Sequence, residues 1–336
     1  MDSSASAPDR QRLEGLDALR GIAAFMVLLF HVEYAFGLTP HFQRAYLSVD
    51  FFFLLSGMVM ARQYEGRFPD TAAFLRKRLA RLWPVMAIGA ALGTIVFAPQ
   101  MPPLGALMAC LMGLLLVPWL GSDKGLFPLN PPAWSILFEL LANALHAAVL
   151  HRLATGWLLA ISALCGAILL ARAPNLDLGA VREYAVLGVP RVVMSYALGI
   201  ALWRLRGRLP RLPAWLGLAL VPAVIVSLPR TALTPLYGDL GFALITAPLA
   251  LIAGLSPLGF GRRALVWLGW LSFPLYAVHY PVLMFMGKFT GPLPAVLTAL
   301  GLAWLSAHGV DALRARLTGT PAQATLPPCR IQTAPH

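Results

Sequence analysis

Long apolar segments, separated by short polar and basic loops, recur along the whole chain. Each has the length of roughly 17–25 residues that an α-helix needs to cross a hydrocarbon core. No period-two alternation runs over several segments, which disfavours a transmembrane β-barrel. The pattern predicts an all-α polytopic membrane bundle of about ten spans, at 16–36, 46–63, 74–98, 132–150, 155–171, 184–203, 213–229, 236–255, 264–286 and 292–312.

One further apolar stretch, 102–119, is bracketed by Pro102-Pro103 and Pro118 and is short for a span. We expect it to be re-entrant or interfacial, because the basic clusters then all fall on one side of the membrane. Basic loops normally face the cytoplasm, so we expect both termini there, in a bacterial inner membrane. The residues placed inside are Arg62, Arg67, Arg76, Lys77, Arg78, Arg81, Arg152, Arg204, Arg206, Arg208, Arg211, Arg262, Arg263, Arg314 and Arg316.

Composition supports a membrane protein, since 59% of the 336 residues are hydrophobic and 12% charged, against about 25% charged in soluble domains. The net charge of +12 reflects loop arginines, which argues against a nucleic-acid partner. Cys110, Cys165 and Cys329 lack paired spacing, so neither a disulfide framework nor a metal site is expected. We expect a disordered cytoplasmic tail at 1–12, a transmembrane domain at 13–313 and a Pro-rich cytoplasmic tail at 314–336. His31 and Glu33 follow the first apolar core without a small-x-small site, so this helix is expected to be retained.

The first predicted helix carries two residues that lipid does not favour. Eleven residues separate Arg20 from His31, which places both on one helix face about 16 Å apart. Ionisable residues inside a membrane often mark a relay, a ligand site or a catalytic site, and imidazole titrates near neutral pH. A snorkelling Arg20 and a hydrogen-bonded packing histidine remain the alternatives.

Polar residues in the second and third helices extend this pattern. Asp50 lies near the outer end of the second helix, where it is suited to orient an imidazole or simply to meet the headgroups. Arg78 and Arg81 lie one turn apart at the cytoplasmic boundary. Guanidinium groups bind phosphate oxygens bidentately, so this pair suits a phosphorylated donor, although a topology signal or lipid contact explains it nearly as well.

Two later helices carry polar stripes. Ser135, Glu139, Asn143 and His146 recur every three or four residues, so they must face the protein interior or a wet cavity, or form a structural seam between helices. In the helix "WLGWLSFPLYAVHYPVL", one face presents Ser272, Tyr276 and His279. The ten-span topology places His31, Asp50, Ser135, Glu139 and His279 in the outer half and the arginines at the inner entrance.

The sequence resembles the membrane-bound acyltransferase-3 family. The matching segments occur in the family's order: "LDALRGIAAFMVLLFH", "SVDFFFLLSG", "RKRLARLWP", "PPAWSILFELLANALHA" and "LGWLSFPLYAVHYPVL". The resemblance implies that Arg20 and His31 match the family's Arg-x10-His, with His31 catalytic, and that Arg78 and Arg81 match its RxxR motif for donor binding. Many relatives carry "WSLSVEEQFY" where this chain has "WSILFELLAN", so Glu139 keeps one glutamate position and Leu140 replaces the second.

The resemblance and the residues together predict an O-acyltransferase that moves a short acyl group, such as acetyl, from cytoplasmic acyl-CoA to a hydroxyl of an extracytoplasmic glycan or lipid-linked saccharide. No bound cofactor or metal is expected. We expect His31 to be the base or nucleophile, Asp50 or Glu139 to orient it, and Arg20, Arg78 and Arg81 to hold the donor phosphates. Acceptor or oxyanion candidates are Ser135, Asn143, Tyr276 and His279. A proton-coupled exporter of a sugar or drug and a non-enzymatic scaffold are the competing hypotheses.

Overall fold

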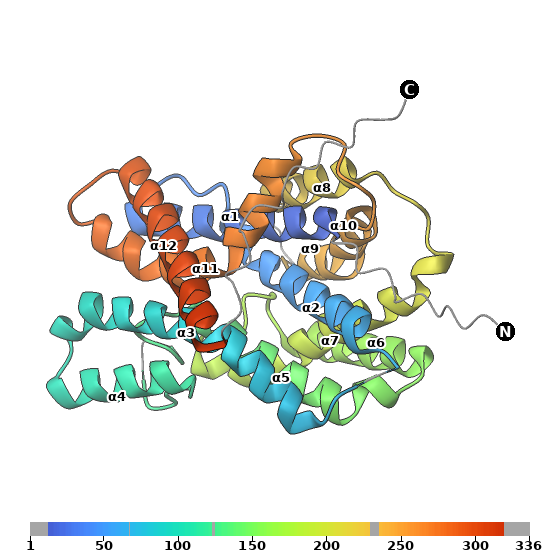
Figure 1. Ribbon diagram of the computed structural model, residues 1–336, viewed down its shortest axis with the longest axis horizontal. Coiled ribbons are helices and arrows are strands. Elements are labelled where there is room, and N and C mark those ends of the chain that lie inside the picture. Colours follow the sequence, from blue (N-terminus) through green and yellow to red (C-terminus); the bar gives the residue numbers. More distant parts are fainter. Residues whose placement is uncertain (1–12, 67, 123–124, 229–234, 319–336) are drawn as a thin grey trace.

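The computed structural model describes residues 13–66, 68–122, 125–228 and 235–318, and within these ranges the chain is a helical bundle with no β-strand (Figure 1). Its helices are α1 (Glu14–Phe36), α2 (Ser48–Tyr64), α3 (Thr71–Phe97), α4 (Pro103–Leu115), α5 (Ala133–Ala148), α6 (Thr155–Arg172), α7 (Ala185–Leu205), α8 (Ala214–Ser227), α9 (Pro235–Gly241), α10 (Ala247–Gly254), α11 (Arg262–Met286) and α12 (Pro292–Thr318). A π-helical turn, Phe242–Thr246, joins α9 to α10. Residues 1–12 and 319–336 lie outside the described ranges, and so does most of the predicted C-terminal tail.

Eight helical segments of the described chain are long and apolar enough to cross a membrane. They correspond to the predicted spans except 132–150 and 213–229, which form the shorter apolar helices α5 and α8. A helix satisfies its own backbone hydrogen bonds, which lipid cannot do. The chain is therefore a polytopic helical membrane protein, as its apolar pattern predicts.

Helix α4 follows α3 and folds back along it. Its 13 residues span only about 20 Å, less than the hydrocarbon thickness of about 30 Å. The indole of Trp83 on α3 donates to the carbonyl of Leu114 near the far end of α4. The chain then returns along α3, where Leu129 packs on Gly93, before α5 begins. The stretch thus has the re-entrant course expected of a segment too short to span.

The centre of the bundle is a parallel pair of helices, α1 and α11. Glu14 pairs with Arg262, Arg20 donates to the Gly269 carbonyl, and His31 contacts His279. The sequence offset between partners is 248 or 249 residues in all three contacts, so the two helices keep one register over most of their length. A Cβ atom on Gly269 would lie 2.1 Å from the Asp17 carbonyl oxygen, so only glycine permits this close approach.

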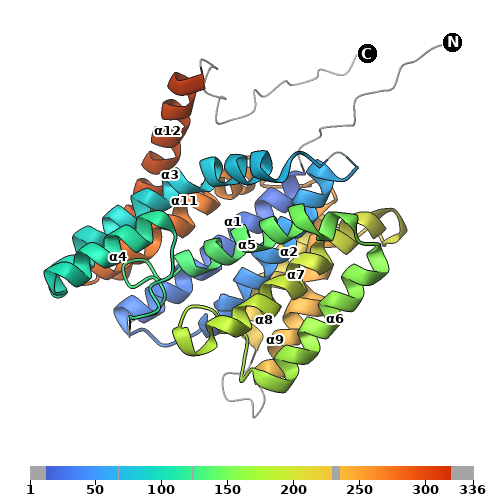
Figure 2. The ribbon, with the colours of Figure 1, turned by 90° about the horizontal axis from the view of Figure 1, so that it is seen from below.

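A second close pair, α2 with α7, packs beside the first. A Cβ atom on Gly199 would lie 2.0 Å from the carbonyl oxygen of Leu54, and one on Gly57 would lie 2.1 Å from that of Tyr196. In lipid, burying apolar side chains between helices gains no hydrophobic free energy, because the lipid tails are equally apolar. Helices there associate through close packing at small residues such as these glycines. In both ribbon views α4 and α6 lie at opposite sides of these central helices (Figures 1 and 2).

The basic helix ends gather at one end of the bundle. Arg204 at the end of α7 binds Glu65 after α2 and the carbonyl of Leu153 before α6. Arg314 near the end of α12 donates to the Arg81 carbonyl on α3, while Arg262 pairs with Glu14 at the start of α1. We call this the basic end. It collects the described arginines that the sequence pattern assigns to one side of the membrane, whereas Arg67 lies outside the described residues.

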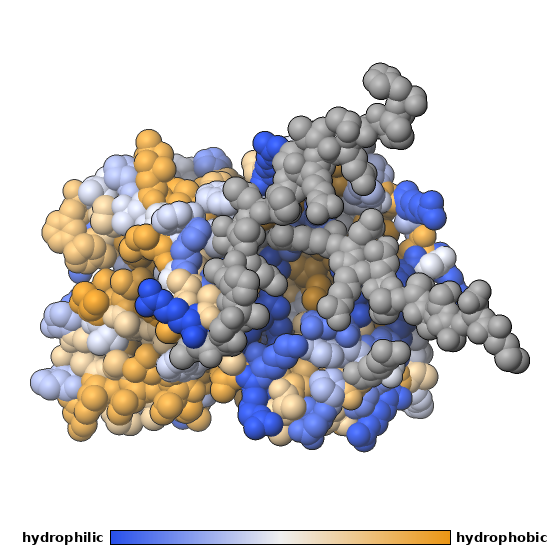
Figure 3. Space-filling view, in the orientation of Figure 1, coloured by the Kyte–Doolittle hydropathy of each residue, from blue (hydrophilic) through white to orange (hydrophobic). Residues whose placement is uncertain are grey.

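The surface of the bundle is apolar where helices α4 and α12 face outward. Exposed leucines on α4 include Leu104, Leu107, Leu111 and Leu115. In the space-filling view, hydrophobic side chains gather at the left and hydrophilic ones at the lower centre and right (Figure 3). Exposed apolar surface of this extent is typical of a lipid-facing helix and would be unusual on a soluble monomer.

Candidate active site

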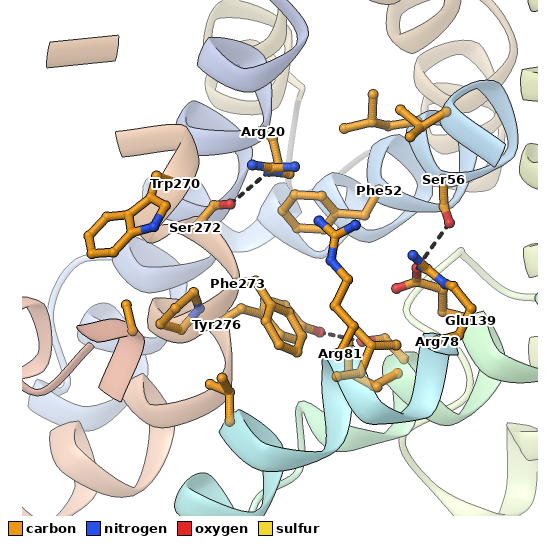
Figure 4. A pocket seen from close by; sticks show the side chains of 18 of the residues that line it. Arg20, Phe52, Ser56, Arg78, Arg81, Glu139, Trp270, Ser272, Phe273 and Tyr276 are labelled. Carbon is orange, nitrogen blue, oxygen red and sulfur yellow. Dashed lines mark hydrogen bonds and ion pairs between the residues drawn. The ribbon is translucent and has the colours of Figure 1, made fainter. Parts of the chain in front are cut away.

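A cavity of about 480 Å³ lies between α1, α2, α3, α5, α11 and α12. It begins at the basic end, where Asp17, Asp311 and Arg314 line it, and extends outward to Val49 and Tyr276. The side chains of Arg20, Arg78 and Arg81 converge on it from α1 and α3 (Figure 4). The structure therefore brings the three arginines predicted for donor binding to one space.

The ionic groups that line this cavity do not balance. Among the described residues, four arginines line it against three carboxylates: Arg20, Arg78, Arg81 and Arg314 against Asp17, Glu139 and Asp311. Each carboxylate is paired with a neighbouring arginine: Asp17 with Arg20, Glu139 with Arg78, and Asp311 with Arg314. Arg81 is left as the surplus cation, and no acceptor for its guanidinium is found in the described part of the chain.

Arg78 and Glu139 form the most buried ion pair in the cavity. Nη2 of Arg78 lies 2.5 Å from Oε1 of Glu139, and the same oxygen accepts a hydrogen bond from the Ser56 hydroxyl at 2.9 Å. The Nε–H of Arg78 is buried and, within the described residues, meets no acceptor. A buried donor without a partner is costly, so the ion pair with Glu139 leaves this guanidinium incompletely satisfied. Glu139 thus lies beside the inner arginines and does not contact His31.

Ser135 and Tyr276 meet at the outer end of the cavity. Their hydroxyl oxygens lie 2.7 Å apart, and the Tyr276 hydroxyl also donates to the Pro132 carbonyl at 3.2 Å. Both residues line the cavity and come from the polar stripes predicted on α5 and α11. The structure therefore joins two stripes that the sequence could describe only separately.

His31 and His279 form a pair one turn beyond Tyr276. Nδ1 of His31 lies 3.1 Å from Nε2 of His279 and 2.9 Å from the Val27 carbonyl oxygen. His279 is buried, whereas His31 keeps a partly exposed ring edged by Phe30 and Tyr280. Neither histidine is among the described residues that line the cavity.

The backbone fixes the tautomers of this pair when both rings are neutral. Nδ1 of His279 faces the carbonyl oxygens of Leu275 and Tyr276, which only accept, so that nitrogen carries the proton and Nε2 carries the lone pair. The Nε2 lone pair of His279 then accepts from Nδ1–H of His31. Since a neutral imidazole has one proton, Nε2 of His31 is left with a lone pair, as a base or nucleophile requires.

Asp50, expected to orient His31, lies instead in a separate buried network at the opposite end from the basic residues. Arg191 of α7 binds its carboxylate through two nitrogens, at 3.0 and 2.7 Å. Arg191 also donates to the carbonyls of Leu178 and Tyr46, and its guanidinium lies over the Trp134 ring. Both side chains of this ion pair are fully buried. The five residues that the ten-span topology placed in the outer half therefore do not form one cluster, because Asp50 pairs with Arg191 and Glu139 with Arg78, away from His31 and His279.

The other half of the α5 stripe forms a seam with α7. The Tyr196 hydroxyl donates to Oδ1 of Asn143 at 3.1 Å and lies 3.0 Å from Nδ1 of His146, while the Asn143 amide donates to the Glu139 carbonyl. The stripe therefore serves two purposes: Ser135 and Glu139 face the cavity, whereas Asn143 and His146 hold helices together. Asn143 does not reach the cavity.

Sequence reasoning did not single out Arg191, Asp239 or Arg314. Arg191 and Asp239 lie inside apolar spans, which is itself a signal of function or of a buried partner. Asp239 is fully buried and accepts from Arg44, from the Tyr46 hydroxyl and from the Leu176 amide. Arg314 was assigned only to the basic end, because nothing in a helical period reveals that α12 closes over α3.

Comparison with known proteins gives a family match over most of the chain. A family model described as an acyltransferase domain matches residues 13–308, a range that holds the histidine pair and nearly all of the cavity. A protein of Rhizobium radiobacter described as "Protein 2 in picA locus" is 36% identical over 166 residues, covering 43% of this chain and 84% of that protein. No solved structure matches the chain significantly.

Proposed function

The chain belongs to this acyltransferase family, and we propose that it is an O-acyltransferase that moves a short acyl group, such as acetyl, from cytoplasmic acyl-CoA to a hydroxyl of an extracytoplasmic glycan. The observation that carries the proposal is the cavity with its surplus arginine, which runs from the basic end towards the His31–His279 pair. The arginines at the basic end suit a phosphorylated donor, and the His31–His279 pair at the other end suits acid–base chemistry.

The donor site is proposed for the inner part of the cavity. The phosphates of CoA are highly charged, and guanidinium groups bind phosphate oxygens in charge-assisted, bidentate contacts. Arg81 lines the cavity and offers such contacts without breaking an ion pair of the described residues. Arg20 is held by Asp17, the Gly269 carbonyl and Ser272, and we assign it to shape the wall beside the donor.

The orientation of the protein follows from its charge distribution. The basic end contains the described arginines of six loops and helix ends, and basic segments are retained in the cytoplasm of bacterial cells. We propose that this end faces the cytoplasm, in the inner membrane, with both termini on that side. The cavity then opens towards the compartment that supplies acyl-CoA, and the partly exposed edge of His31 faces the acceptor.

The chemistry is assigned to His31. Its Nε2 takes the proton of the acceptor hydroxyl while that oxygen attacks the thioester carbonyl carbon; the C–S bond breaks, and the CoA thiolate leaves and is protonated. General-base catalysis of this kind contributes about 10²–10⁴ in rate. His279 accepts the Nδ1–H of His31 throughout, so it holds the ring orientation and stabilises the imidazolium that forms. A covalent acyl-imidazole on His31 is the variant mechanism.

The proposal is tested with purified protein in nanodiscs and radiolabelled acetyl-CoA. We expect CoA release by the wild type and a loss of about 10²–10⁴ in its rate for His31→Ala, with CoA affinity retained in the variant. Label retained on the protein would select the covalent variant. The matched control is His308→Ala, a histidine of α12 whose ring packs against Trp304 and Trp270 and which does not line the cavity. An unchanged rate in folded His31→Ala would refute the assignment.

A further inference from the structure

Two aromatic rings from different helices, here called the partition, meet in the outer part of the cavity. Phe52 of α2 and Tyr276 of α11 meet edge to face, with ring centroids 5.9 Å apart and ring planes at 80°. Both rings line the cavity, and the close-up view draws both side chains in it, with Phe52 near Arg20 and Arg81 (Figure 4). Beyond Tyr276 come the ring of His279, 5.8 Å away, and then that of His31, 4.9 Å further.

The two rings are not equally free to move. The Tyr276 hydroxyl is held by Ser135 and by the Pro132 carbonyl, and its helix is fixed against α3, where a Cβ atom on Gly89 would lie 2.2 Å from the Ala277 carbonyl oxygen. Phe52 has no polar group to anchor it and is only partly buried. A rotation about its side-chain bonds is therefore the smaller change that would open the partition.

The partition separates the groups that must react. The arginines line the cavity on one side, and the histidine pair lies outside the cavity on the other. Along the line of ring contacts, a thioester held by Arg78 and Arg81 would reach His31 past Phe52 and Tyr276. The walls near the partition are apolar, formed by Val49, Phe53 and Ile136, so they accept a hydrocarbon chain, and the opening beside Phe52 sets how large a chain passes.

We propose that Phe52 is the specificity-determining residue for the acyl group: its ring is the movable half of the partition and restricts transfer to short acyl chains. This inference rests on the proposed acyl-CoA donor. The limit on acyl-chain length is set where the acyl group moves past Phe52. CoA binding is a separate step, because it depends on the arginines at the other end of the cavity.

The test compares acetyl-CoA with hexanoyl-CoA as donors for three variants in nanodiscs. Phe52→Ala is expected to raise the ratio of hexanoyl to acetyl transfer rates at least tenfold, with CoA affinity within twofold of wild type. Phe52→Leu is the milder replacement if the alanine variant does not fold, and is expected to raise the same ratio by less. Phe273→Ala is the matched control, since Phe273 is partly buried and lines the same cavity from α11; its ratio is expected to stay within twofold. A wild-type ratio in folded Phe52→Ala or Phe52→Leu would overturn the inference.

A second measurement detects whether the acyl group reaches position 31, without requiring acyl transfer to an acceptor. In a His31→Cys background, the thiolate at position 31 displaces bromide from 2-bromoacetyl-CoA or 2-bromohexanoyl-CoA, forming a C–S bond. Peptide mass spectrometry separates this label from that on the native cysteines Cys110, Cys165 and Cys329. Each rate is divided by the rate with glutathione. We expect the normalised hexanoyl rate to be at least tenfold below the acetyl rate and to recover on Phe52→Ala. Equal normalised rates for the two reagents with Phe52 in place would overturn the inference about Phe52 and leave the acyl-CoA donor intact. If the protein neither bound CoA nor was labelled, the inference and the proposed donor would both be overturned.

Discussion

Two regions of this protein hide an arginine–carboxylate pair inside a membrane bundle, and they differ in what surrounds the pair. The outer network, made of Asp50, Arg191, Arg44 and Asp239, is closed, because each carboxylate is matched by one arginine. The inner pair, Arg78 with Glu139, lines a cavity of about 480 Å³, and one nitrogen of Arg78 has no acceptor in the part of the chain that the structure describes.

The difference teaches how to interpret charges in membrane helices. Any buried ion pair must repay the cost of removing two charges from water, and the outer network does so by directing its guanidinium groups to carboxylates, carbonyls and a hydroxyl. Beside the inner pair, Arg81 lines the open cavity and meets no acceptor among the described residues. A balanced network supports stability, whereas an unbalanced one beside a cavity indicates an anionic ligand.

The largest expected effect is a loss of folding stability when the ion pair of the outer network is broken. Asp50→Ala leaves Arg191 buried and unpaired, and breaking such a pair costs about 3–5 kcal/mol. We expect a corresponding fall in the free energy of unfolding, measured by denaturation in detergent. The double variant Asp50→Leu/Arg191→Met should recover most of it, since apolar replacement of both partners is often neutral. A single variant as stable as wild type would show that water reaches this network.

The next effect concerns ligand binding by the inner pair. Arg78→Ala removes charge-assisted hydrogen bonds that are worth about 1.5–3 kcal/mol, so CoA affinity should fall about 10–100-fold, measured by calorimetry. The loss of stability should be smaller than for Asp50→Ala, because the side chain of Glu139 is 18% exposed and that of Asp50 is fully buried. Equal destabilisation by the two changes would remove the distinction between an open and a closed region.

A smaller effect tests the surplus cation. Arg81→Ala should weaken CoA binding by about tenfold, or about 1.4 kcal/mol, and should flatten its dependence on salt, because one phosphate contact is lost. Arg76→Ala is the matched control, since Arg76 lies on the same helix but does not line the cavity. Equal losses for the two variants would indicate a general attraction by the basic end in place of a defined contact.

The smallest expected effect is a gain in CoA affinity, whereas the two preceding substitutions lower it. Glu139→Gln keeps an oxygen for the Ser56 hydroxyl and for Arg78 but removes one negative charge from the cavity, so CoA should bind about two- to fivefold more tightly at low salt. A competition assay against a labelled CoA analogue measures this change. Weaker CoA binding would contradict this expectation. It would mean that Glu139 serves mainly to hold the Arg78 side chain in position.

Much of this architecture follows from local pattern. The lengths of the apolar runs predicted the helices, eight of which in the described chain are long and apolar enough to cross a membrane. Pro102-Pro103 and Pro118 correctly bracketed the shorter helix α4. The period of the α5 stripe predicted that Ser135, Glu139, Asn143 and His146 face inward, and all four do so, because lipid cannot satisfy polar side chains. The arrangement of arginines likewise anticipated that the basic helix ends meet.

The sequence by itself thus determined the membrane class, the spans and the identity of the chemistry-bearing residues, because those depend on helix period and on hydropathy. Only the tertiary structure decided their partners. It paired His31 with His279 through the parallel register of α1 and α11, gave Asp50 to Arg191, and directed Glu139 to Arg78. The physical reason is that a helical period fixes which face a side chain occupies, whereas its depth and neighbours depend on how helices far apart in sequence pack. Here glycines allow close contact between α1 and α11, whose partner residues are 248 positions apart in the sequence.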